Sequence, residues 1–249
     1  MSIAMMAGLA VVMLGTAFLS GVFGMAGGMI LIGVLIAVMP VPAAMALHAV
    51  TQMASNFWRA LLWRRHIVWR SAAFYGAGCL LALGGWAFTG YVPDRAVALL
   101  MLGCTPFLAR LLPPSWRPDA LKPVHGVIYG TVCMTLLLLT GVAGPLVDAF
   151  FLGGKLDRRQ IVATKSTCQV FGHAVKLLYF AELIDQTAGV DPIMAILAIG
   201  ASMLGTSLAR RLLEAMSDAT FRRWAGRIIT TIAGWYVAQG AWLLLADRF

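Results

Sequence analysis

Apolar runs separated by short polar or glycine-rich gaps occupy nearly all of the 249-residue chain. Roughly 20 apolar residues are enough for a helix to cross the hydrocarbon core of a bilayer, so the runs predict an all-α integral membrane protein. Helices are expected near residues 3–22, 28–39, 43–63, 71–91, 95–112, 122–141, 145–153, 160–181, 192–209 and 224–246. The gaps leave no room for a separate soluble domain, so we expect one membrane domain over residues 1–249.

A glycine phrase occurs once in each half of the chain and interrupts an apolar run each time. Residues 20–24 read Ser-Gly-Val-Phe-Gly, and residues 140–144 read Thr-Gly-Val-Ala-Gly. The apolar runs that follow, 28–39 and 145–153, are too short to span a bilayer. Each phrase therefore predicts either a break within one spanning helix or the tip of a re-entrant hairpin, which enters and leaves the membrane on the same side.

The distribution of Lys and Arg between loops distinguishes these two topologies, because cytoplasmic loops are enriched in both residues. Of the 19 Lys and Arg residues, 16 lie in loops or at chain ends. If both interrupted units span the membrane, the two sides carry nine and seven of these charges, which specifies no orientation. If both units are re-entrant hairpins, the two sides carry 14 and two. The second threading is expected, with both termini extracytoplasmic, hairpin one entering from outside and hairpin two from the cytoplasm.

This threading divides the chain into two repeats, residues 1–113 and 121–249, each made of a hairpin and three transmembrane helices. Three crossings are an odd number, so the second repeat is inverted relative to the first. Inverted repeats in transporters place the binding site near the bilayer midplane, where interrupted helices meet. We therefore expect a site between the two hairpin tips.

Polar side chains lie along one face of the helix that follows each hairpin. Both sets have the spacing i, i+4, i+8 and i+11, and they comprise His48, Gln52, Asn56 and Arg59 in the first repeat and Lys165, Gln169, His173 and Lys176 in the second. A charge near the bilayer centre costs a few kcal/mol, so Lys165 and Asp148 are expected to face a cavity or each other. Lys165 is then either the ion-pair partner of Asp148 or a cationic anchor for an anion. Asp148 either caps a half-helix or couples transport to protons.

The other polar and glycine residues have two interpretations each. His48 and His173 fit proton transfer or donation to an oxyanion, and equally hydrogen bonds between helices. Arg59 and Lys176 lie near helix ends, where long cationic side chains snorkel toward the membrane surface. Glycines at a helix break expose backbone amides that hold anions, while small residues also allow close helix packing.

Composition removes several function classes. The net charge of +9 does not indicate nucleic-acid binding, because the basic residues lie in short gaps and form no basic face. The four cysteines are scattered singly, without the spacing of a metal site or redox pair. No HExxH pair or P-loop occurs, and all four histidines precede the protease-like Gly-Ala-Ser triplet at 200–202. The sequence therefore predicts no enzyme, metal or cofactor.

Across essentially its whole length, the chain resembles the sulfite exporter TauE/SafE family, also called the 4-toluene sulfonate uptake permease family. The resemblance rests on residues 20–28, 48–51, 140–144 and 163–166. It implies movement of a sulfur-containing anion such as sulfite, thiosulfate, sulfoacetate or another organosulfonate across the cytoplasmic membrane. The chain departs from the pattern at Pro145 and Asp148, where the first repeat has Met25 and Gly28, and by lacking a Ser after the Thr of residues 48–51.

Together these observations predict a secondary transporter of a small sulfur-containing anion that works by alternating access in a bacterial cytoplasmic membrane, with proton coupling left open. The expected substrate-binding residues are Gly21, Gly24, Gly27, Gly28, His48, Thr51, Gln52, Asn56, Gly141, Gly144, Lys165, Gln169 and His173. Asp148 is the candidate for proton coupling. The expected partners are the anion and lipid, in a monomer or homodimer. A non-transporting membrane sensor or assembly subunit is the alternative, and an intramembrane enzyme a more remote one.

Overall fold

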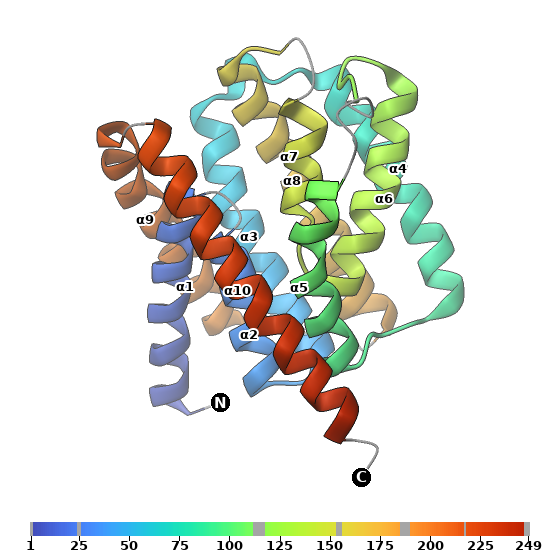
Figure 1. Cartoon of the computed structure of the whole chain (residues 1–249), viewed down its shortest axis with the longest axis vertical. Helices are drawn as coiled ribbons and strands as arrows, with labels where there is room; N and C mark the ends of the chain where they lie inside the picture. Colours follow the sequence, from blue (N-terminus) through green and yellow to red (C-terminus); the bar gives the residue numbers. More distant parts are fainter. Residues whose placement is uncertain are drawn as a thin grey trace.

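The computed structural model describes residues 2–23, 26–111, 118–152, 156–184, 190–216 and 218–246, which form helices and turns but no strand (Figure 1). The first half contains α1 (Ile3–Phe23), α2 (Ala26–Val38), α3 (Val41–Leu62), α4 (Trp69–Thr89) and α5 (Arg95–Leu111). The second half contains α6 (Pro123–Thr140), α7 (Gly144–Leu152), α8 (Arg158–Leu178), α9 (Pro192–Ala215) and α10 (Asp218–Ala246). A 3₁₀ turn, η1 (Arg64–His66), follows α3, and a π-helical turn, η3 (Tyr179–Ile184), extends α8. The predicted all-α fold is confirmed.

The start of α8 is fixed by a capping box that the apolar pattern did not reveal. The Asp157 carboxylate accepts hydrogen bonds from the backbone amides of Arg159 and Gln160, and the Gln160 side chain accepts one from the Asp157 amide. The bond from the Gln160 amide is the main reason that the pKa of Asp157 lies below its ordinary value. The cap starts the helix at Arg158, two residues before the predicted range.

Five helices among the described residues are long and apolar enough to cross a membrane: α1, α4, α6, residues 192–209 of α9 and residues 223–246 of α10. The helices α2 and α5 are apolar but shorter. Large apolar side chains are exposed on the outer surface, including Leu81 of α4, Ile196 of α9 and Trp235 of α10. A surface of this kind is suited to lipid, and the fold is that of a multi-pass membrane protein.

The helices of the two halves pack in matching pairs. Helix α1 of the first half packs against α9 of the second half, and α6 of the second half packs against α4 of the first. The short helix α2 contacts α3 and α10, while α7 contacts α8 and α5. The remaining large contacts join α3 to α8 and α5 to α10. Exchanging α1–α5 with α6–α10 therefore reproduces each of these contacts.

Helices α3 and α5 each run antiparallel to their counterparts, α8 and α10. His48 near the start of α3 lies beside Lys176 near the end of α8, while the Val68 amide beyond α3 bonds to Thr164 near the start of α8. Likewise, Gly103 of α5 packs against residues 233 and 237 of α10, whereas Gly240 packs against residues 96 and 100. The start of α1 and the end of α10 lie at the same end of the molecule (Figure 1).

Two pairs of consecutive helices near the glycine phrases fold back on each other, α1 with α2 and α6 with α7. In the first, a Cβ atom on Gly27 of α2 would clash with the Thr16 carbonyl oxygen and the Ser20 hydroxyl of α1. In the second, the Tyr129 ring of α6 stacks on the Phe150 ring of α7, with centroids 5.0 Å apart. The structure therefore has a helical hairpin at each phrase.

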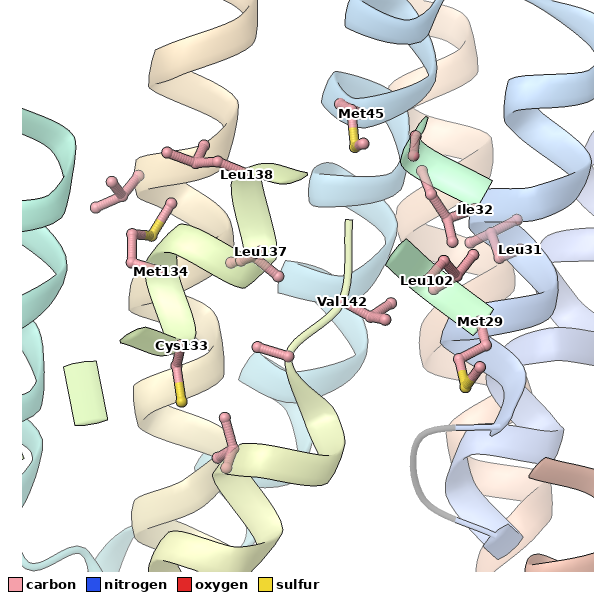
Figure 2. Close-up of a cluster of buried hydrophobic side chains, with 14 of the residues drawn as sticks. Met29, Leu31, Ile32, Met45, Leu102, Cys133, Met134, Leu137, Leu138 and Val142 are labelled. Atoms are coloured by element: carbon pink, nitrogen blue, oxygen red, sulfur yellow. The ribbon is translucent and has the colours of Figure 1, made fainter. Parts of the chain in front are cut away.

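The turn of the second hairpin packs directly against the first hairpin. Gly141 caps α6 with a φ of +81°, a conformation that glycine adopts readily and L side chains rarely do. A Cβ atom there would lie 2.6 Å from Ile32 Cγ1 of α2 and 3.1 Å from Met45 Sδ of α3. The buried cluster in Figure 2 surrounds this contact and includes Leu137 of α6 and Val142 of the turn. The hydrophobic core thus holds the two hairpins together.

We predict that Gly141→Ala destabilises the protein by about 2–4 kcal/mol, because the variant combines a left-handed backbone with an overpacked contact. Thermal unfolding of the detergent-solubilised protein measures the effect as a lower Tm. Gly84→Ala is the matched control, since a Cβ atom on this exposed α4 glycine meets no atom within 4 Å. Equal Tm values for the two variants would contradict the proposed packing.

Candidate functional site

A cavity lies where α3, α8 and the two hairpins meet. Its lining comes from α1, α2, α3, α8 and the turn before α7, and comprises Ser20, Gly28, His48, Gln52, Asn56, Arg59, Val142, Ala143, Gly144, Lys165, Gln169 and His173. The space inside the cavity that the centre of a water molecule can occupy has a volume of about 40 Å³. One water needs roughly 10–15 Å³ on that scale, so the cavity has room for a few water-sized groups.

Eight of the residues expected to bind substrate line this cavity: Gly28, His48, Gln52, Asn56, Gly144, Lys165, Gln169 and His173. Six of these come from the two polar stripes, which face each other because α3 packs against α8. The i, i+4, i+8 spacing was therefore the most informative signal in the sequence.

Four other expected residues lie against helices and do not line the cavity. Gly21 packs against Thr206 and Ala209 of α9, and Gly27 packs against α1. The Thr51 hydroxyl donates to the carbonyl of Leu47 in its own helix. Gly141 lies in the contact between hairpins described above. Gly24 falls outside the described residues.

The expected pairing of Lys165 and Asp148 is present. The Lys165 ammonium group and the Asp148 carboxylate form the ion pair found among the described residues, and both side chains are partly buried. Asp148 lies in the second turn of α7, so the pair joins the second hairpin to α8. Lys165 also lines the cavity, and its charge there is balanced by Asp148.

Arg59 is a second cation of the cavity wall, where the sequence had suggested snorkelling to the surface. It is partly buried, and no ion pair between described residues includes it. No acidic side chain belongs to the described lining of the cavity. Asp148 acts electrostatically on Arg59 as well as on Lys165, but it is one carboxylate beside two cations, so these described groups keep a net positive charge.

The snorkelling expectation is wrong for Lys176, whose side chain is 0 % exposed. Its ammonium nitrogen lies 2.8 Å from His48 Nδ1 and 3.2 Å from the carbonyl oxygen of Gly141. Lys176 lies in the last turn of α8, but the helical course continues beyond it through η3 to Ile184. The side chain therefore points inward, to α3 and the turn of the second hairpin.

Two buried polar atoms of cavity-lining residues have no hydrogen-bond partner among the described residues: Ser20 Oγ and His173 Nδ1. Ser20 and His173 are 6 % and 5 % exposed. An unpaired polar atom at such a depth costs about 1–3 kcal/mol, which a bound ligand or water removes. The sequence analysis did not propose Ser20, although it is the first residue of the glycine phrase.

A protein-family model matches this chain. The model of the sulfite exporter TauE/SafE family matches residues 9–236, which is nearly the whole chain. The chain belongs to the sulfite exporter TauE/SafE family. No curated protein and no solved structure gives a significant match.

We predict that the Lys165–Asp148 pair contributes to stability through the mutual charge of its two members. Lys165→Met and Asp148→Asn should each lower the Tm, since each leaves one partly buried partner unpaired. The double variant should lose less stability than the two single losses combined, and a double-mutant cycle of thermal unfolding measures the difference. Simple additivity would show that the two groups do not interact.

Proposed function

We propose that this TauE/SafE protein is a secondary transporter that moves a small sulfur oxyanion, such as sulfite or thiosulfate, across the cytoplasmic membrane. The observation that carries the proposal is the cavity between the hairpins. It is lined by two cations, Arg59 and Lys165, beside the one carboxylate of Asp148, and its described lining has no acidic side chain. Ser20 and His173 add unpaired polar atoms. Such a cavity attracts an anion and repels a cation.

The neutral groups of the cavity supply hydrogen bonds to the anion. Gln52, Asn56 and Gln169 have side-chain amide donors, and His173 has a ring nitrogen free for a ligand. Residues 142–144 bring the N-terminal end of α7 to the cavity, and the positive end of a helix dipole favours an anion. Arg59 provides charge, and Lys165 adds a donor whose charge Asp148 balances.

Cavity size favours the smaller anions of the family. A volume of about 40 Å³ for water centres accommodates a few water-sized groups. Sulfite and thiosulfate have four and five heavy atoms, whereas an aromatic sulfonate adds a six-membered ring. The proposal is therefore directed to the inorganic anions.

Alternating access would come from rocking the two halves around this site. The matching contacts of α1–α5 and α6–α10, and the antiparallel course of α3 and α8, support inverted repeats over residues 1–113 and 121–249. The division of 14 and two basic residues supports re-entrant hairpins with both termini outside the cytoplasm.

Flux measurements in proteoliposomes test the proposal. Purified protein should accumulate sulfur-35-labelled sulfite or thiosulfate, and Arg59→Gln should raise the KM about 10–100-fold, since a hydrogen bond to a charged group contributes about 1.5–3 kcal/mol. Arg95→Gln, which changes an exposed arginine at the start of α5, should transport like the wild type.

The same preparation tests a non-transporting sensor. A sensor would gain thermal stability from the anion but show no flux. Flux with an unchanged KM in Arg59→Gln would instead keep the transport function and remove Arg59 from the site.

A further inference from the structure

A chain of hydrogen bonds connects the two hairpins through two buried basic side chains. His48 Nε2 lies 3.1 Å from the carbonyl oxygen of Gly28 in α2, and His48 Nδ1 lies 2.8 Å from the Lys176 nitrogen. Lys176 in turn lies 3.2 Å from the carbonyl oxygen of Gly141, in the turn of the second hairpin. His48 and Lys176 are both 0 % exposed.

The chemistry of the acceptors fixes where the hydrogens lie. A carbonyl oxygen only accepts, so His48 Nε2 must carry the hydrogen that bonds to Gly28. In neutral His48 the other nitrogen, Nδ1, is then an acceptor, and Lys176 donates to it and to Gly141. If His48 Nδ1 also held a proton while Lys176 was an ammonium, two positively charged donors would face each other with no acceptor between them. The pair therefore holds at most one excess proton.

No carboxylate in the described structure balances a proton on this pair. Asp148 of α7 is engaged by Lys165, and the Tyr179 hydroxyl of η3 donates to the carbonyl of Tyr91. The titratable group that faces the pair is His173 of α8, whose ring centroid lies 5.6 Å from that of His48. An uncompensated charge at such depth is costly, so a negative charge in the adjacent cavity favours the protonated pair.

We propose that Lys176 and His48 form a proton-binding site that takes up one proton when an anion enters the cavity and releases it when the anion leaves. This inference rests on the proposed anion transport. His48 and His173 line the cavity, so the anion would lie next to the pair. In the proton step, the Lys176 amine gains a proton from a hydronium ion and forms an N–H bond, leaving water. Release reverses the step, and the anion and proton move in the same direction.

Protonation also strengthens the connection between the hairpins. Hydrogen bonds from an ammonium group are roughly twice as strong as bonds between neutral partners. Because the chain ends on carbonyls of both hairpins, the loaded state holds the two tips more firmly than the empty state. By thermodynamic linkage, the factor by which the bound anion raises the proton affinity equals the factor by which the bound proton raises the anion affinity.

Isothermal titration calorimetry of the purified full-length protein tests the coupling. The probes are thiosulfate and methanesulfonate, whose charges stay fixed near neutral pH. The buffers are Tris, bis-Tris and imidazole, which differ in deprotonation enthalpy and, being neutral or cationic, do not compete for an anion site. Proton uptake makes the observed heat less exothermic as the deprotonation enthalpy of the buffer rises, with a slope of at most one proton per anion.

Variants assign the proton to the pair. Lys176→Met and Lys176→Arg should still bind the anion through the cavity groups, with heats that do not depend on the buffer, because neither side chain exchanges a proton near neutral pH. Lys122→Met is the matched control at an exposed lysine and should keep the wild-type slope. Size-exclusion profiles establish that each variant is folded.

The outcomes separate this inference from the proposed function. If the wild-type protein binds the anion with the same heat in all three buffers, the proton site is overturned while anion binding stands. This outcome requires no variant. A slope that persists in Lys176→Met or Lys176→Arg also overturns it. If the wild-type protein binds neither probe, the result contradicts the anion site and also the coupling of proton uptake to anion binding.

Discussion

The hydrogen bonds of Lys176 join the two halves of the fold beside the cavity. Far from a surface, its side-chain nitrogen has to find partners within the protein, and it finds them in His48 of α3 and the carbonyl of Gly141. His48 in turn reaches the carbonyl of Gly28. Two hairpins from opposite halves of the chain are thereby tied to the two central helices, and the cavity lies beside this connection.

This arrangement places charge where an anion can use it. Lys165 and Asp148 balance each other and join α7 to α8, whereas Arg59 has no ion-pair partner among the described residues. Ser20 and His173 keep unpaired polar atoms in the same cavity wall. The polar interior is therefore divided between groups that maintain the fold and groups that remain available to a ligand.

The sequence predicted the helices, the hairpin positions and the polar stripes because each follows from local periodicity or composition. It could not separate glycines that pack, such as Gly21 and Gly27, from Gly28 and Gly144, which line the cavity, since close packing and anion binding both select small residues. The prediction that Lys176 snorkels to the surface was wrong because its surroundings depend on η3 extending α8. The unpaired Ser20 hydroxyl became visible only when the first hairpin was placed against the cavity.

The central claim is that the cavity between the hairpins binds a sulfur oxyanion. A crystal structure with selenite, the selenium analogue of sulfite, tests it most directly, because anomalous scattering at the selenium edge locates the anion without ambiguity. We expect one strong peak in the cavity, with oxygens within hydrogen-bond distance of Arg59, His173 and the N-terminus of α7. A fully occupied peak elsewhere, with the cavity holding only water, would contradict it.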